Sequence, residues 1–353
     1  MPYGKDEVHT MRIGLLTSGG DCPGLNAVIR SAVLHGIKSF SDEFVGFRGG
    51  WRGLIEGDYI ELSRQDVRGL ARVGGTILGT SRTHPYNHPG GGPEKIAAQL
   101  KRHGIDAVIA IGGEGTLAGA RRLAEDGIPV VGVPKTIDND LRGTDYTFGF
   151  DTAISIATDA MDRLRTTGES HHRCMVAEVM GRHVGWIALH SGMATGAHAI
   201  LIPEQQITID QICEWAEQVH SRGRSPLVVV AEGFIPEGYD AALAGKGQED
   251  DGRPRLGGIG EWVTHQIEAR TGIETRNTTL GHIQRGGNPT GYDRVLATRF
   301  GIKALDLVHE RAWGHMAALR GTEIVTVNLA EALDGLKSVP AERYAEAQIL
   351  FGR

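Results

Sequence analysis

The chain has 353 residues, 40% hydrophobic and 23% charged, which is the composition of an ordinary globular protein long enough for two domains. A formal net charge of −6 excludes a global positive field for nucleic acid or an anionic membrane, so an anionic substrate requires a local cluster of cations. The three cysteines lack a CxxC spacing, the first ten residues do not form a signal peptide, and no apolar run approaches the roughly 20 residues that span a bilayer, so we expect a soluble cytoplasmic protein.

Short aliphatic runs alternate with helical patterns from the N-terminus onward. This alternation predicts an α/β fold of two Rossmann-like lobes, with mainly parallel sheets sandwiched by helices. Such folds bind ligands at the carboxyl ends of their strands, so functional residues are expected just after the strands. The predicted buried strands are 12–17, 107–111, 130–133, 174–179 and 227–231, and the predicted helices are 25–37, 116–126, 151–166 and 209–221.

The chain is expected to cross between the lobes near residue 150 and again near residue 285. One lobe then consists of 1–149 plus about 285–312, and the other of 150–284 plus about 313–353. Two loops stand out by composition and are expected to be mobile: 81–93 is rich in histidine, proline and glycine, and 237–260 is acidic and glycine-rich.

Two glycine turns follow predicted strands. Residues 17–30 read TSGGDCPGLNAVIR, and residues 108–120 read VIAIGGEGTLAGA. Glycine permits close approach of a ligand to the backbone, and the helix that follows offers free amides to phosphate. Neither turn matches GxGxxG or GxxxxGK[ST]. Glu114 in the second turn adds a carboxylate for magnesium, so these turns predict phosphate handling, with a purely structural strand–helix turn as the alternative.

An acidic loop follows the third predicted strand, where residues 130–140 read VVGVPKTIDND. Asp138 and Asp140 stand at its carboxyl end. In phosphoryl transfer to an alcohol, one carboxylate accepts the hydroxyl proton while others bind metal or orient a cation. A solvated turn is the alternative for this loop alone, but its position beside the two glycine turns favours catalysis.

Five motifs occur in order between roughly residue 11 and residue 320: SGGDCPGLNAVIR, GGEGT, PKTIDND, EVMGRHVGW and LGHIQRGG. Together they resemble the motifs of 6-phosphofructokinases of the bacterial phosphofructokinase A family. The resemblance implies ATP-dependent phosphorylation of fructose 6-phosphate with Mg²⁺, the committed step of glycolysis. It also implies self-association, commonly as a homotetramer, with active sites completed by a neighbouring subunit.

The resemblance assigns roles on the donor side. Asp138 matches the base that deprotonates the sugar 1-hydroxyl, Thr136 and Asp140 flank it, and Glu114 stands where the family has a magnesium-binding aspartate. Arg82 would neutralise charge on the transferred group. The residues that match donor-binding positions are Gly20, Arg82, Thr83, Gly113, Glu114, Gly115 and Thr116.

The resemblance also assigns a sugar side. Arg182 is counted among the catalytic residues as well, and Arg173 and Arg276 resemble a pair that reaches across from another subunit. A surface ion pair is the alternative for each arginine, and a structural histidine is the alternative for His282. The residues that match substrate-binding positions are Thr136, Ile137, Asp138, Arg173, Met180, Gly181, Arg182, Glu232, Arg276, His282 and Arg285.

Two positions bear on the phosphoryl donor. Gly115 leaves room for the α-phosphate and ribose of ATP, where pyrophosphate enzymes of this family resemble the motif with an aspartate. Lys135 instead resembles the pyrophosphate pattern. This combination is similar to that of a mixed-substrate, actinobacterial-like group. We weigh steric and like-charge exclusion more heavily and expect ATP, with a reversible pyrophosphate-dependent enzyme as the alternative.

The resemblance further suggests a degraded effector site. Arg30 and Arg165 match effector-binding positions, Asp58 reverses an expected positive charge, and Arg222 and Arg224 keep part of a basic cluster. We therefore expect weak or absent control by ADP or phosphoenolpyruvate. Two rivals from other classes are a dinucleotide-dependent dehydrogenase, which the absent GxGxxG disfavours, and a non-catalytic sugar-phosphate sensor, which the intact Thr136 and Asp138 disfavour.

Overall fold

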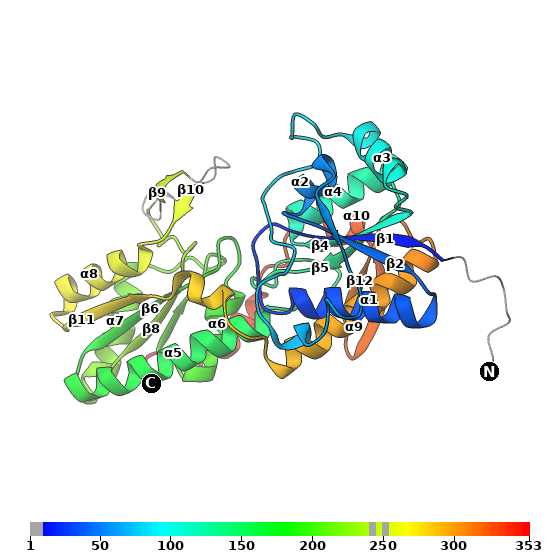
Figure 1. Ribbon diagram of the computed structural model, residues 1–353. Helices are drawn as coiled ribbons and strands as arrows, with labels where there is room; N and C mark the ends of the chain where they lie inside the picture. The colour runs from blue at the N-terminus through cyan, green and yellow to red at the C-terminus, as the bar shows by residue number, and fades with distance from the viewer. Residues whose placement is uncertain (1–9, 240–244, 249–253) are drawn as a thin grey trace. The chain divides into compact units, whose positions relative to one another are not determined.

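The structure is a computed structural model that describes residues 10–239, 245–248 and 254–353 (Figure 1). The chain divides into two compact units. Unit 1 holds the described residues of Met1–Ile137, together with Leu141–Gly149 and Arg285–Gly335. Unit 2 holds Asp138–Asp140, the described residues of Phe150–Gln284, and Leu336–Arg353.

Unit 1 is built on a seven-stranded sheet of order β13-β12-β5-β4-β1-β2-β3. Its five central strands are parallel, and β13 and β3 join the two edges in antiparallel orientation. The central strands β1, β4 and β5 are almost entirely buried, which explains their continuous aliphatic sequences. The strands are β1 Arg12–Ser18, β2 Glu43–Phe47, β3 Tyr59–Glu61, β4 Ala107–Gly112, β5 Val130–Pro134, β12 His315–Arg320 and β13 Glu323–Asn328.

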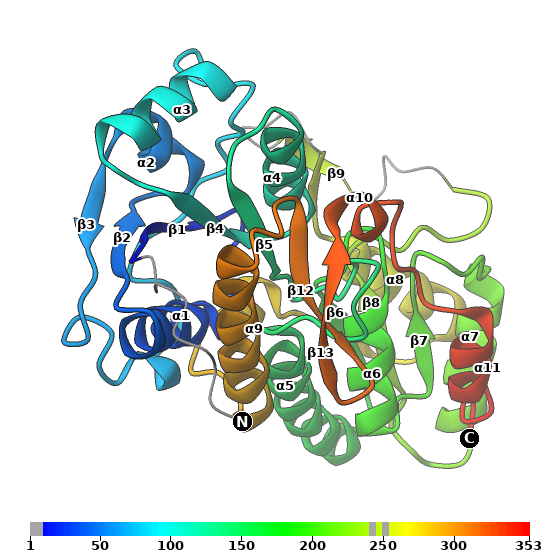
Figure 2. The same cartoon turned by 90° about the vertical axis from the view of Figure 1, so that its right-hand side faces the viewer.

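Helices cover both faces of this sheet. Helices α1 and α9 pack together on one face, whereas α2, α3, α4 and α10 lie on the other (Figures 1 and 2). The second face holds a core of large side chains such as Trp51, Phe47 and Leu117. The helices are α1 Leu25–Ser39, α2 Trp51–Glu56, α3 Pro93–Arg102, α4 Glu114–Glu125, α9 Gly291–His309 and α10 Leu329–Ala332.

Unit 2 has a four-stranded, wholly parallel sheet of order β11-β6-β8-β7. Helices α5 and α6 pack together against it, as do α7 and α8. Thr208 caps α7, and its hydroxyl accepts from the amide of Gln211 in a capping box. The elements are β6 Cys174–Val179, β7 Ala199–Leu201, β8 Leu227–Ala231, β11 Thr275–Thr279, α5 Phe150–His171, α6 Trp186–Thr195, α7 Ile209–His220, α8 Ile259–Thr271 and α11 Ala341–Gln348.

The predicted α/β class with mainly parallel sheets is confirmed, and every predicted strand and helix has a counterpart. Two assignments differ from the predicted lobes: Asp138–Asp140 group with unit 2, and the segment from about 313 to Gly335 does not join the second lobe. Strand β12 instead pairs with β5, so residues up to Gly335 belong to unit 1. Strand β11, with the sequence TRNTT, was not predicted because it is a partly exposed edge strand and carries polar residues.

The two loops singled out by composition have different outcomes. Residues 81–92 form turns that lead into α3. Within 237–260, short strands β9 Gly245–Gln248 and β10 Pro254–Leu256 pair antiparallel, and residues 240–244 and 249–253 lie outside the described residues. None of the helices in the described part of the chain combines the length and apolar character that crossing a bilayer requires.

Candidate active site

The first glycine turn follows β1. Gly19 lies in the left-handed region at φ +83°, and its amide donates to the Ser81 carbonyl at 2.9 Å. A Cβ on Gly20 would lie 2.8 Å from Nη1 of Arg285, and the same nitrogen donates to the Asp21 carbonyl at 3.3 Å. No side chain caps α1 after the turn. A bare backbone beside a guanidinium is an arrangement suited to an anion.

The second glycine turn lies where the strand order reverses. The chain runs from β1 outward to β2 on one side and from β4 to β5 on the other. The carboxyl ends of β1 and β4 are therefore the switch point at which doubly wound sheets generally bind their ligands. Helix α4 begins at Glu114 without a side-chain cap. A Cβ on Gly115 would meet nothing within 4 Å. Uncapped amides and open space therefore coincide in the first turn of α4.

Lys135 and Thr136 follow β5 at the same edge. Lys135 is 4% exposed, its Nζ donates to the Gly20 carbonyl, and its amide donates to the Gly112 carbonyl at 2.9 Å. Thr136 is buried, and its carbonyl accepts from Oγ1 of Thr147 at 2.7 Å. The Lys135 ammonium therefore links the end of β5 to the first glycine turn and brings a buried positive charge to it.

The loop that carries Arg82 and Thr83 is tied to the first glycine turn through Ser81. The Ser81 carbonyl accepts the Gly19 amide, and its Oγ accepts the Thr83 amide at 3.4 Å. Arg82 is exposed and Thr83 half-buried. Arg82 and Thr83, two of the predicted donor-binding residues, therefore lie on a loop that is hydrogen-bonded to the turn after β1. The residues that follow β1, β4 and β5 are called the unit 1 edge below.

Glu114 is the predicted magnesium ligand. It is exposed at the start of α4, beside the uncapped amides. Within the described residues, no group of three or more histidine, cysteine, aspartate or glutamate side chains is arranged to hold a metal ion. Mg²⁺ commonly binds through one or two carboxylates together with substrate phosphates, so a single exposed carboxylate at a phosphate-binding turn fits this ion.

The acidic loop joins the two units through consecutive residues. Thr136 and Ile137 group with unit 1, whereas Asp138, Asn139 and Asp140 group with unit 2. Asp138 and Asp140 are half-buried, and Asn139 is 1% exposed with φ +53°. This burial argues against the alternative of a solvated turn and favours a constrained loop.

The turns after β6 and β8 in unit 2 are joined by backbone hydrogen bonds. The Glu232 amide donates to the Val179 carbonyl at 2.9 Å, and the Gly233 amide donates to the Gly181 carbonyl at 3.1 Å. Gly181 has φ +137°, and a Cβ there would lie 2.7 Å from the Val184 carbonyl oxygen. Arg182 and Glu232 are therefore carried by two turns that hydrogen-bond to each other at the carboxyl ends of their strands.

Gln284 is a residue that sequence reasoning missed. It is fully buried, its Oε1 accepts the Met180 amide at 3.3 Å, and its Nε2 donates to the Gly281 carbonyl at 3.0 Å. The amide side chain therefore joins the turn after β6 to the segment with exposed His282. The signal was a glutamine inside the quoted LGHIQRGG motif. The residues that follow β6, β8 and β11 are called the unit 2 edge below.

The comparisons with known proteins agree with this geometry. A family model described as Phosphofructokinase matches residues 12–308. The chain belongs to the phosphofructokinase family. All five motifs quoted from the sequence begin and end inside the matched range, and they occupy the turns that form the two edges.

Relatives within the phosphofructokinase family are named for different phosphoryl donors, pyrophosphate or ATP. The chain is 58% identical over 342 residues to the pyrophosphate–fructose 6-phosphate 1-phosphotransferase of Amycolatopsis methanolica, and 53% identical over 342 residues to ATP-dependent 6-phosphofructokinase 3 of Streptomyces coelicolor. Each match covers 97% of this chain and 100% of the relative. The crystal structure of Pichia pastoris phosphofructokinase in the T-state matches with a TM-score of 0.80 and 32% identity, over 99% of this chain and 37% of that longer chain.

Two predicted phosphofructokinase residues lie away from the unit 2 edge. Arg173 directly precedes β6, and Arg276 is the second residue of β11, so both stand at the amino ends of their strands. Both pair with Glu274, at 2.9 Å for Nη2 of Arg173. Their guanidinium groups hold the pKa of this carboxyl below its usual range. These pairs with Glu274 match the surface ion pair that the sequence offered as the alternative for each arginine.

The cysteines near the motifs have no reactive character. Cys22 and Cys174 are fully buried, and burial raises the pKa of each thiol to about 12. Both thiols are therefore protonated at neutral pH, as expected of small core residues.

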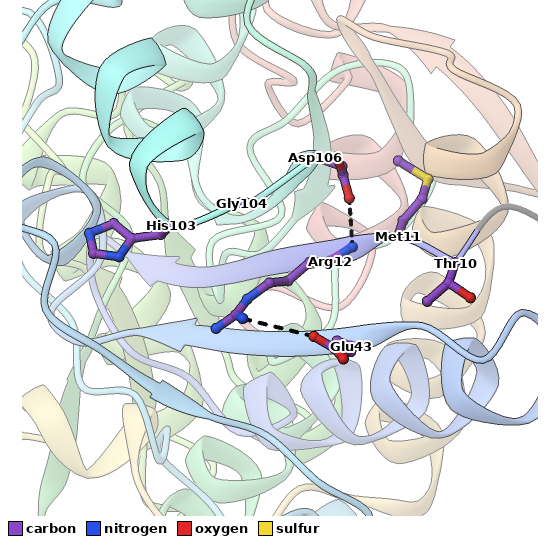
Figure 3. Close-up of a pocket in the computed structure, with 7 residues that line it drawn as sticks. All are labelled: Thr10, Met11, Arg12, Glu43, His103, Gly104 and Asp106. Atoms are coloured by element: carbon purple, nitrogen blue, oxygen red, sulfur yellow. Dashed lines mark hydrogen bonds and ion pairs between the residues drawn. The ribbon is translucent and has the colours of Figure 1, made fainter.

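A cavity of about 350 Å³ lies at the amino ends of strands of the unit 1 sheet, opposite the carboxyl ends that carry the predicted site residues (Figure 3). Arg12 and Glu43 begin β1 and β2, and Asp106 directly precedes β4. The Arg12 amide donates to Oδ2 of Asp106 at 2.8 Å, and its guanidinium pairs with Glu43 at 3.8 Å. This hollow lies at the amino ends of strands, where charged groups already satisfy one another, and it does not include the predicted site residues.

Proposed function

We propose that the protein phosphorylates the 1-hydroxyl of D-fructose 6-phosphate to give fructose 1,6-bisphosphate, with ATP as the donor, in the committed step of glycolysis. The observation that carries the donor is Gly115. It stands in the uncapped first turn of α4, and the position of its missing Cβ has no neighbour within 4 Å. This space is available to the α-phosphate and ribose of ATP, which lie beyond its β- and γ-phosphates.

The donor side works mainly through backbone. Backbone amides at Gly20 and in the first turn of α4, from Gly113 to Thr116, would donate hydrogen bonds to phosphate oxygens, helped by the helix dipole. Arg82 and Thr83 would contact the donor from the adjoining loop. Glu114 would hold Mg²⁺, which when bound with the donor neutralises negative charge on the phosphates.

The sugar side works through side chains. We propose that Arg182, His282 and Arg285 bind anionic oxygens, and that Glu232 accepts hydrogen bonds from sugar hydroxyls. Met180 and Gly181 would form the wall of this site. Arg173 and Arg276 would bind the phosphate group of the sugar that occupies the active site of a neighbouring subunit. This role requires self-association, and we expect a homotetramer in the cytoplasm.

Asp138 is proposed as the general base. It would accept the proton of the sugar 1-hydroxyl as that oxygen forms a bond to the γ-phosphorus of ATP. The bond from this phosphorus to the β,γ-bridging oxygen breaks, and ADP leaves with the electron pair. Thr136 and Asp140 flank the base. Since Ile137 and Asp138 are consecutive, the chain itself carries the base from the donor-binding unit into the unit of the sugar site.

A pyrophosphate-dependent, reversible phosphofructokinase is the second candidate. Lys135 favours it, because a buried ammonium at the first glycine turn suits a small, highly charged donor. The 58% identity to a relative named for pyrophosphate supports it as well.

A donor comparison tests both candidates. The purified protein is assayed with fructose 6-phosphate and Mg²⁺, with ATP or pyrophosphate, and in both directions. We expect kcat/KM for ATP to exceed that for pyrophosphate. Turnover with pyrophosphate and none with ATP would replace the first candidate by the second. Saturable binding of fructose 6-phosphate without turnover by either donor would indicate a sugar-phosphate sensor and contradict both.

A further inference from the structure

Asn139, the residue directly after the proposed base, has an unusual backbone. Its φ of +53° lies in the left-handed region that L side chains rarely adopt, although asparagine tolerates it better than most. The residue is 1% exposed. Backbone in this region persists when surrounding contacts hold it, so the loop around Asp138 needs a support.

Lys337 supplies two such contacts from far along the chain. Its backbone amide donates to the Asp140 carbonyl at 2.9 Å, and its Nζ donates to Oδ1 of Asn139 at 3.1 Å. The two bonds hold the residues directly after Asp138 through both backbone and side chain. All of these residues belong to unit 2, so the contacts lie within one compact body.

Lys337 is itself held firmly. Nε1 of Trp186, at the start of α6, donates to the Lys337 carbonyl at 2.7 Å, and the ammonium lies 5.6 Å from the centroid of the same indole. Two residues later, the Val339 amide donates to Oε1 of Glu204 at 3.0 Å, and this carboxylate also accepts the Gly185 amide at 3.0 Å. The lysine is therefore held on both sides of its Cα.

The rest of the C-terminal segment is anchored to the unit 2 sheet. The Tyr344 hydroxyl donates to the Ile200 carbonyl in β7 at 2.8 Å, and the ring is 1% exposed. The Gly352 amide donates to the His198 carbonyl at 3.1 Å. Residues 336–353 thus connect a fixed sheet to a strained loop, which is the arrangement of a brace.

We propose that Lys337 is a positioning residue for the phosphoryl-transfer step. Its ammonium fixes the left-handed conformation of Asn139 and thereby the direction in which Asp138 presents its carboxylate. The inference rests on the proposed role of Asp138 as base. General-base catalysis depends on hydrogen-bond geometry, and a shift of about 1 Å can cost about 100-fold in rate. The proposed role of the ammonium is to hold Asn139 and not to bind a substrate, so its loss should act on kcat and not on substrate binding.

The main test replaces the ammonium and keeps the backbone bonds. Lys337→Met retains the length of the side chain. Lys303→Met is the matched control because Lys303 is a partly buried lysine on α9 that pairs with Glu310, directly after that helix. We expect Lys337→Met to lower kcat about 10- to 100-fold, with KM for fructose 6-phosphate and for the donor within about twofold. Lys303→Met should match the wild type. A wild-type kcat in folded Lys337→Met would overturn the proposal, and so would a rise in KM with kcat unchanged.

A second variant covers the case in which Lys337→Met does not fold. Asn139→Gly adopts φ +53° without steric cost but loses the acceptor for the ammonium. We expect the same loss of kcat at undiminished thermal stability. Combined with Lys337→Met, it should cost little beyond either single change, because both remove one interaction. Losses that multiply would mean that the two side chains act separately and would contradict the proposal.

Hydrogen–deuterium exchange separates this inference from the proposed function. Peptides that cover 136–142 should exchange faster in Lys337→Met than in the wild type, whether or not the protein is assayed with the correct donor. Unchanged exchange in these peptides would overturn the proposal that Lys337 holds the loop around Asp138. An inactive wild type with faster exchange in the variant would leave the brace standing and reject the proposed function instead.

Discussion

The two edges, which are proposed to bind the donor and the sugar phosphate, differ in how much they rely on backbone and on side chains. At the unit 1 edge, glycines stand at 19, 20, 113 and 115, and the position of a Cβ on Gly115 has no neighbour within 4 Å. The donor is proposed to bind there largely through backbone amides. At the unit 2 edge, Arg182, Glu232 and His282 project from turns that Gln284 and close glycine contacts hold together. The first edge should therefore be most sensitive to side chains that are added, and the second to side chains that are removed.

The largest effect on kcat is expected from a change of Asp138, the proposed base in the acidic loop. Asp138→Asn removes the proposed base with almost no change of volume. We expect kcat to fall roughly 10³-fold, while affinity for fructose 6-phosphate and for the donor changes little. Steady-state kinetics and calorimetric binding measure the two quantities. Asp58→Asn, at an exposed ion pair with Arg48, is the control and should retain full activity. Full turnover in Asp138→Asn would end the proposed mechanism.

Addition of a side chain at the unit 1 edge should give the next largest effect. Gly115→Asp places a carboxylate where the nucleotide is proposed to lie, so like-charge repulsion should lower kcat/KM for ATP about 100-fold. Gly291→Asp is a matched control, since Gly291 also lies in the first turn of a helix, is exposed and has no neighbour within 4 Å of an added Cβ. Both variants are assayed with ATP and with pyrophosphate. Equal kcat/KM for ATP in Gly115→Asp and wild type would show that the open space is not the nucleotide site.

Removal of a support at the unit 2 edge should be milder and selective. Gln284→Leu leaves the Met180 amide without its acceptor in a buried place, which should lower the free energy of unfolding by about 1–3 kcal/mol. Because this bond joins two sugar-side turns, KM for fructose 6-phosphate should rise several-fold with the donor KM unchanged. Gln99→Leu removes a comparable bond to the Ile55 carbonyl in unit 1 and should change stability alone. A rise in the donor KM only would contradict the assignment of the two edges.

The smallest effect is expected from effectors. Arg165 donates to the carbonyls of Thr195 and Gly196, Arg224 pairs with Glu169 at 3.1 Å, and Arg222 donates to the Gly352 carbonyl at 2.8 Å. These internal contacts compete with any phosphorylated effector. Saturation with fructose 6-phosphate should stay hyperbolic when phosphoenolpyruvate or ADP is added at millimolar concentration. A strongly sigmoidal curve under these conditions would show that an effector site survives.

The sequence by itself predicted the central strands and the motifs at their ends. Strands β1, β4, β5, β6 and β8 are buried on both faces, so their aliphatic runs were visible without any tertiary information. The glycine turns and the acidic loop lie directly after such strands, and their local sequences fix short-range geometry.

Only the tertiary structure decided which distant segments support those motifs. Edge strands such as β11 carry polar residues, and β12 joined unit 1 through pairing with β5, neither of which a local pattern reveals. The contacts of Gln284 with Met180 and of Lys337 with Asn139 join residues 104 and 198 positions apart. Such bonds depend on how the chain packs, because a single polar side chain looks the same in sequence whether it meets water or a buried partner.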